Sequence, residues 1–206
     1  MRPNMVTTDK IVYNTVMNPS GSPSLTNLPA RDRILQTAHD LFYGEGIRAT
    51  GINRVIAESG VTKVTFYRHF PSKNDLIREF LEYRHRRWIA WFADALQRHG
   101  GTLEALTPTL SEWFRHAVYR GCAFINSVGE LGGELPEVKE IACRHKREMT
   151  ALIAGLMPPS AQRDLDAQAL ALAVDGAIVR TQLEATPDAA LLAFDRALQA
   201  IQGSWL

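Results

Sequence analysis

The stretch GIRATGINRVIAESGVTKVTFYRHFPSKNDLIREFL, residues 46–81, decides the fold of this chain. Gly60 and Pro71 separate apolar residues that recur at helical spacing, so the stretch predicts two short helices and the start of a longer third. Thr62 is placed to cap the second short helix, and Ser72 with Asp75 to cap the longer one. Two short helices around a tight glycine turn favour a helix-turn-helix unit.

The second short helix has one apolar face and one face of groups suited to DNA. Phe66 and Phe70 are four residues apart and therefore share the buried face. Cations donate hydrogen bonds to guanine, which suits Lys63 or Arg68, and a small apolar group contacts a thymine methyl, which suits Val64. Three further residues are placed for phosphate contact, namely Tyr67, His69 and Lys73. A merely polar surface on a short helix remains the alternative interpretation.

The same residues resemble the DNA-binding segment of the TetR family of transcription regulators, over about Arg31 to Leu81. The most specific part is the run from Ala57 to Lys73, in which the family pattern Phe/Leu-Tyr-x-His-Phe-x-Ser/Asn-Lys stands as FYRHFPSK from Phe66 to Lys73. The resemblance implies a three-helix DNA-binding head whose third helix enters the major groove, a long fourth helix, and a helical body that dimerises through its last two helices. It assigns DNA contact to Thr50, Thr62, Lys63, Thr65, Tyr67, Arg68, His69 and Lys73.

Two positions depart from the commonest pattern of that family. Val64 stands where a small residue is frequent, and Gly51 stands where Ser or Thr often caps the helix that begins there. We therefore expect Thr50, with Asn53 as its partner, to provide the cap of that helix.

Outside this stretch the chain also reads as helix. An apolar stripe from Ile34 to Phe42 predicts a helix that begins near Pro29 and ends at Gly44 and Gly46. The longer helix that starts after Ser72 continues to Gly100, and five more are predicted over 102–119, 121–132, 136–157, 160–185 and 187–202. The fold class is therefore all-α with about nine helices. We expect three parts: a flexible tail over 1–27, a helix-turn-helix domain over 28–75, and an effector-binding and dimerisation domain over 76–206.

The middle helices carry aromatic residues mixed with a few polar groups, a composition that suits a pocket for a small, mostly apolar molecule. The candidate effector residues are Trp113, Phe114, Cys122, Phe124, Asn126, Glu130, His145 and Met149. Ordinary core packing is the alternative for each of them. Residues 165–183 and 189–201 are rich in alanine with larger apolar residues at helical spacing, which suits either a subunit interface or a single core.

Composition limits the other classes of function. The segment from Arg31 to Arg87 contains eleven Lys/Arg and seven Asp/Glu, a net charge of +4. The segment from Trp88 to Leu206 contains ten Lys/Arg and fourteen Asp/Glu, a net charge of −4. Only the first segment therefore suits a polyanion. Two cysteines without metal or redox spacing suit a reducing compartment, and the chain shows neither a signal peptide nor an apolar run that could span a bilayer, so we expect a cytoplasmic protein. Glu82 and His85 have the spacing of a di-iron motif but lack its second copy, so we expect neither a metal nor a cofactor.

These observations predict a ligand-responsive DNA-binding regulator, most simply a homodimeric repressor that releases a palindromic operator when a small molecule binds. A helical small-molecule-binding protein without DNA binding is the alternative, and the exposed cations expected on the second short helix argue against it. An enzyme would need a convergent catalytic set, which the sequence does not show.

Overall fold

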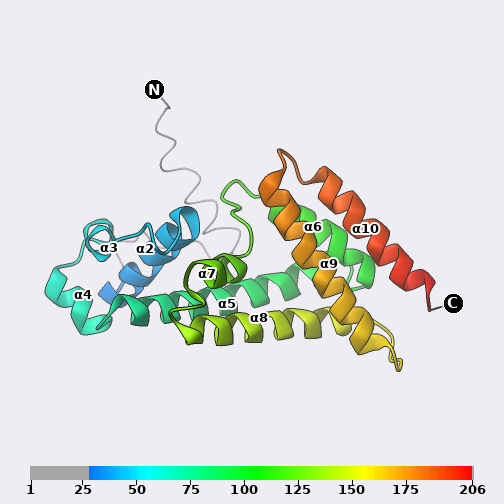
Figure 1. Cartoon of the computed structure of the whole chain (residues 1–206), viewed down its shortest axis with the longest axis horizontal. Coiled ribbons are helices and arrows are strands. Elements are labelled where there is room, and N and C mark those ends of the chain that lie inside the picture. Colours follow the sequence, from blue (N-terminus) through cyan, green and yellow to red (C-terminus); the bar gives the residue numbers. More distant parts are fainter. Residues whose placement is uncertain (1–27, 206) are drawn as a thin grey trace. The chain divides into compact units, whose positions relative to one another are not determined.

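A computed structural model describes residues 28–205, and its regular structure there is helical throughout, with nine α-helices and one short 3-10 helix. The predicted all-α class is confirmed. The α-helices are α2 (Ala30–Glu45), α3 (Ile52–Ser59), α4 (Lys63–His69), α5 (Lys73–Arg98), α6 (Leu106–Phe114), α7 (Ala123–Leu131), α8 (Pro136–Ala154), α9 (Arg163–Leu183) and α10 (Asp188–Gly203), and the 3-10 helix is η2 (Leu103–Ala105) (Figure 1). The predicted flexible tail at 1–27 lies outside the described residues.

One predicted helix is shorter than expected. The helix over 102–119 opens as η2 and then runs as α6 only to Phe114. The chain after α6 turns instead, through Gly121 at φ +82°, and the Tyr119 hydroxyl lies 2.7 Å from that of Thr181 on α9. Helical periodicity in the sequence does not indicate a hydrogen bond between residues this far apart, which is why the predicted helix extends beyond the observed end of α6.

The described chain forms two compact units, each of which takes residues from separate stretches. The first unit holds the residues up to Arg87 together with Ala123–Ala142, and the second holds Trp88–Cys122 and the residues from Cys143 onward. The units thus interleave along the sequence. The expected boundary at residue 75 separates a DNA-binding from an effector-binding part of the chain. It concerns function, not compact units, and stays a prediction.

In the first unit, α2 packs against α3 and α4, and aromatic side chains fill the core. Phe66 and Phe70 of α4 are both buried. Phe42 of α2 meets Phe80 of α5 edge to face, with ring centroids 5.4 Å apart. Full burial of side chains of this size contributes roughly 1.5–3 kcal/mol each. This core holds the two short helices in place although neither is long enough to be stable alone.

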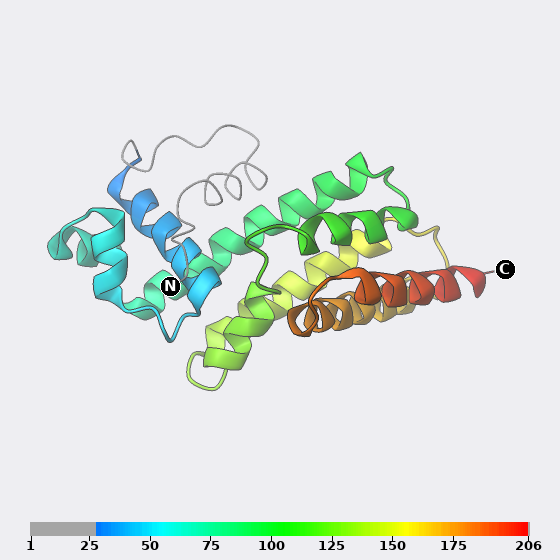
Figure 2. The same ribbon diagram turned by 90° about the horizontal axis from the view of Figure 1, so that it is seen from above.

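In the second unit, α9 and α10 run side by side and antiparallel, as the two views agree (Figures 1 and 2). Alanines between them allow close approach. The Thr107 hydroxyl of α6 donates to Asp195 of α10 at 3.0 Å, and Lys146 of α8 pairs with Asp175 of α9 at 2.5 Å. These contacts tie the helix pair to the rest of the unit.

Candidate nucleic-acid interface

The turn between α3 and α4 depends on one glycine. Gly60 adopts the left-handed conformation, φ 64° and ψ 33°; its amide donates to the Ala57 carbonyl, and the Val61 amide donates to that of Ile56 at the end of α3. Left-handed backbone costs most other residues energy, so glycine is favoured here. The turn directs the chain into α4 within three residues.

The N-terminus of α4 is capped as predicted. Thr62 is the N-cap, and its hydroxyl oxygen accepts from the Thr65 amide at 3.2 Å. The predicted cap of α5 is also present, because the Ser72 hydroxyl accepts from the Asp75 amide at 3.1 Å and lies 2.6 Å from the Asp75 carboxylate. This hydrogen bond from Ser72 holds the pKa of Asp75 below its ordinary value.

The predicted cap of α3 is wrong. The N-cap is Gly51, with no side-chain cap, and the Thr50 hydroxyl instead donates to the Gly46 carbonyl at 2.8 Å. Thr50 therefore fastens the loop between α2 and α3. Its side chain is completely buried, which disfavours the predicted contact with DNA in this conformation.

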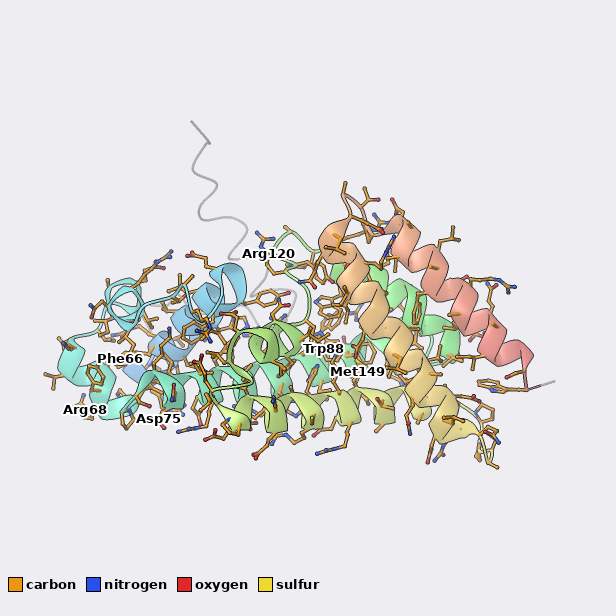
Figure 3. The ribbon with its side chains drawn as sticks, in the orientation of Figure 1. Phe66, Arg68, Asp75, Trp88, Arg120 and Met149 are labelled. Carbon is orange, nitrogen blue, oxygen red and sulfur yellow. The ribbon has the colours of Figure 1, made fainter. Side chains whose placement is uncertain are left out.

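The two faces of α4 differ as the sequence predicts. Phe66 is 0% exposed, whereas Val64, two residues earlier and therefore on the opposite side of the helix, is 78% exposed. Figure 3 labels Phe66 and Arg68 on α4. Thr62, Lys63, Tyr67 and Arg68 are exposed as well, and Thr65 and His69 are half-buried. One short helix thus offers solvent two cations, a phenol, a hydroxyl and an apolar group.

Lys73 is less available than the sequence suggests. Its ammonium donates to the Ile47 carbonyl at 2.7 Å, which joins the first turn of α5 to the loop between α2 and α3. Burial lowers the pKa of Lys73, and the nearby Glu130 carboxylate opposes this effect. The contact favours a structural role for Lys73, and its predicted phosphate contact stays a prediction.

Several other cations of the first unit have structural partners. Arg31 pairs with Glu79 at 2.5 Å, and Arg33 donates to the carbonyls of Ser59 and Leu28. Arg84 is buried, with its guanidinium 4.1 Å from the Tyr43 ring centroid. The sequence pattern of α5 does not indicate this burial, because the partner ring belongs to α2, about forty residues earlier. Arg86 on α5, by contrast, is exposed.

Sequence reasoning missed Arg48, in the loop between α2 and α3. Its guanidinium donates to the Glu130 carbonyl at 2.8 Å and pairs with the Glu134 carboxylate at 2.5 Å. Its backbone amide donates to the Glu130 carboxylate at 2.8 Å. Gly46, at φ +93°, lies against the same carboxylate, since an added Cβ would stand 3.3 Å from it. We call Arg48, Glu130 and Glu134 the Arg48 clamp; it fastens the loop to the end of α7 and to the residues that follow.

The predicted effector residues divide between the two units. Phe124, Asn126 and Glu130 belong to the first, and Trp113, Phe114, Cys122, His145 and Met149 belong to the second. The eight therefore do not form one site within either unit. Glu130 is engaged by Arg48, which disfavours it as a ligand contact. In the second unit, Trp113, His145 and Met149 are buried, and an aromatic cluster forms around Trp88.

Residues 28–205 offer neither a metal site nor a membrane span. No group of three or more potential metal-ligating side chains of this part of the chain is placed to hold a metal ion. No helix there has the length and apolar character needed to cross a membrane.

An all-α chain that presents a capped, polar recognition helix beyond a glycine turn is a helix-turn-helix DNA-binding protein in its architecture. Residues 34–80 match the family described as "Bacterial regulatory proteins, tetR family". The crystal structure of SCO4454, a TetR-family transcriptional regulator from Streptomyces coelicolor, is similar with a TM-score of 0.72 and 28% identity, over 84% of this chain and 93% of that one.

Two further comparisons agree. The HTH-type transcriptional repressor KstR2 of Mycolicibacterium smegmatis is 26% identical over 157 residues, 70% of this chain and 75% of its own length. The TetR-family regulator CifR, in a cysteine mutant with a 26-bp double-strand operator DNA, shares the fold with a TM-score of 0.68 over 97% of this chain, 99% of that chain and at 18% identity. Residues 34–80 thus match the tetR family of bacterial regulatory proteins, and 84% of the chain shares the fold of a TetR-family transcriptional regulator.

Proposed function

We propose that this protein is a homodimeric, ligand-responsive repressor that binds a palindromic operator through α4 and releases it when a small molecule binds the helical body. One observation carries the DNA-binding half: α4 buries Phe66 and Phe70 and presents Lys63, Val64, Tyr67 and Arg68 to solvent. In this assignment, Lys63 and Arg68 donate to guanine or phosphate, and Tyr67 contacts the backbone. Such a protein acts where the chromosome is, in the cytoplasm.

A second copy of the chain is the proposed partner of α9. Leu165, Leu172, Val179 and Leu183 are exposed at spacings of seven, seven and four residues, which places them on one stripe of that helix. Beside the stripe, a groove of about 350 Å³ between α9 and α10 is lined mostly by alanines, together with Gly176, Phe194 and Arg180. An apolar stripe next to an alanine-lined groove is self-complementary, because each copy's leucines can enter the other's groove. Two copies would supply the two recognition helices that a palindrome requires, about 34 Å apart.

The repressor role is supported by KstR2, which is described as a repressor. An effector can change operator affinity only by as much as its own affinity differs between the DNA-binding and released states. The proposed mechanism is therefore a two-state equilibrium that the ligand shifts toward the released state.

The test is selection of bound duplexes from a random pool, followed by titration of the selected operator at several salt concentrations. We expect a palindromic site and a steep fall of affinity with salt. Lys63→Ala and Arg68→Ala should each cost about 1–3 kcal/mol of binding free energy. Arg86→Ala, which removes an exposed cation from α5, is the matched control and should change affinity little. A flat salt response, or equal losses for Arg68→Ala and Arg86→Ala, would refute the assignment of α4.

A further inference from the structure

The interior of the second unit is built around rings from three helices. Trp88 of α5 stacks on Phe92 with ring centroids 4.7 Å apart. Trp113 of α6 meets Trp88 edge to face at 5.2 Å, and His145 of α8 meets it in the same manner at 4.8 Å. We call these four rings the tryptophan cluster; Figure 3 marks Trp88 within it.

Three polar groups at this cluster lack a hydrogen-bond partner among the described residues. They are the indole nitrogens of Trp88 and Trp113 and the hydroxyl of Thr109. The indole nitrogen of Trp91, whose ring contacts both tryptophans, is also buried, but it interacts with the Glu112 carboxylate. The three side chains are 2%, 4% and 0% exposed, so bulk solvent does not satisfy them. Leaving a buried donor unpaired costs about 1–3 kcal/mol, and native proteins rarely leave several together.

The three groups come from facing helices. Thr109 and Trp113 are four residues apart and therefore share one face of α6, and Trp88 packs against Trp113 from α5. By contrast, the indole of Trp205 donates to Asp166 at 2.8 Å. Aromatic side chains with a few unpaired polar groups among them are typical of the lining of a small-molecule site.

We propose that Trp88, Trp113 and Thr109 are the hydrogen-bond donors that recognise the effector, and that the effector is an uncharged, flat, mostly apolar molecule with a carbonyl oxygen. Two indole N–H groups require an acceptor and have nothing to offer a donor. The cluster residues carry no permanent positive charge, and burial of a carboxylate without a cation is very costly, which favours a neutral ligand. Aromatic walls favour a flat one. This inference rests on the proposed ligand response.

The experiment compares two matched pairs of probes on the full-length protein, 1-tetralone with tetralin and 9-fluorenone with fluorene. In each pair only the carbonyl differs. Calorimetric titration should show that a ketone binds at least tenfold more tightly than its hydrocarbon, because a site built to hydrogen-bond an oxygen discriminates against the analogue that lacks it. The indole N–H resonances of Trp88 and Trp113 should shift with the ketone.

Substitutions then locate the preference. Trp88→Phe and Trp113→Phe keep an aromatic ring and remove the N–H, so each should reduce the ketone preference several-fold, as should Thr109→Val. Trp205→Phe is the control and should leave the preference unchanged. Equal binding of ketone and hydrocarbon in both pairs, or a preference that survives all three substitutions, would overturn the inference.

Operator binding, measured in parallel, separates this inference from the proposed function. Operator binding by a protein without ketone preference overturns the ligand class alone. If the protein prefers the ketones but binds no operator, the proposed repressor function is refuted and the proposed ligand class is supported.

Discussion

At the scale of single residues, Thr62 has two roles that one substitution can separate. Its side chain caps α4, and its exposed position faces the proposed duplex. Thr62→Ala should lower the free energy of unfolding by about 1 kcal/mol, because the Thr65 amide loses its acceptor. Thr62→Asp should keep the cap and restore stability, yet weaken operator binding through repulsion of phosphate. Urea unfolding and operator titration measure the two effects. If Thr62→Asp binds as tightly as the parent, Thr62 does not lie near the DNA backbone.

Val64 is the residue at which base preference can be tested most directly. An exposed branched apolar side chain near the start of α4 suits contact with a thymine methyl. Replacement of single thymines by deoxyuridine in the operator should reveal one position per half-site where loss of the methyl weakens binding by about 0.8 kcal/mol. In Val64→Ala that sensitivity should disappear. Retention of the full deoxyuridine effect by the variant would place the methyl against another residue.

At the scale of elements, local signals predict local structure well. The caps at Thr62 and Ser72, the stop at Gly60 and the buried Phe66 were all predictable, since each depends on residues within one helical turn. Contacts between residues far apart in the chain could not be predicted in this way. The sequence around Arg84 is compatible with a surface cation, whereas its guanidinium lies over the ring of Tyr43 on α2. The prediction for Thr50 failed for a different reason, because its hydroxyl donates to the carbonyl of Gly46, only four residues earlier, and does not cap α3.

The Arg48 clamp joins residues more than eighty positions apart, so no periodicity indicates it. Arg48→Ala should lower the free energy of unfolding by about 1 kcal/mol, because it removes the bond to the Glu130 carbonyl as well as the ion pair. Glu134→Ala removes only an ion pair whose partners are more than half exposed, and should cost about half a kcal/mol or less. Arg86→Ala, on the exposed side of α5, is the control for loss of a charge. If Arg48→Ala lowers the free energy of unfolding by no more than this control does, the Arg48 clamp does not hold the loop.

At the scale of the whole molecule, α4 and the α9 stripe have to serve one function. A single α4 reads one half-site, and a palindrome holds two. Most soluble oligomers are symmetric, and a twofold dimer uses the same surface on both subunits. We propose that the stripe on α9 is a surface of this kind, which would account for the 73% exposure of Leu172 in a single chain. Dimerisation would therefore convert two weak half-site contacts into one specific complex.

Leu172→Glu tests this link. Leu172 occupies the middle of the stripe, so a carboxylate there would have to be buried without a partner in the dimer, at a cost of several kcal/mol. We expect the variant to be monomeric by light scattering at micromolar concentration, with an unchanged helical circular dichroism signal because the side chain is exposed in the single chain. Its affinity for the full palindrome should fall toward that for an isolated half-site, while the parent distinguishes the two strongly. Gln162→Glu, at the exposed residue that precedes α9, adds the same charge and should remain dimeric. A Leu172→Glu variant that stays dimeric would move the interface away from α9, and a monomeric variant that keeps full affinity for the palindrome would show that operator recognition does not need the pair.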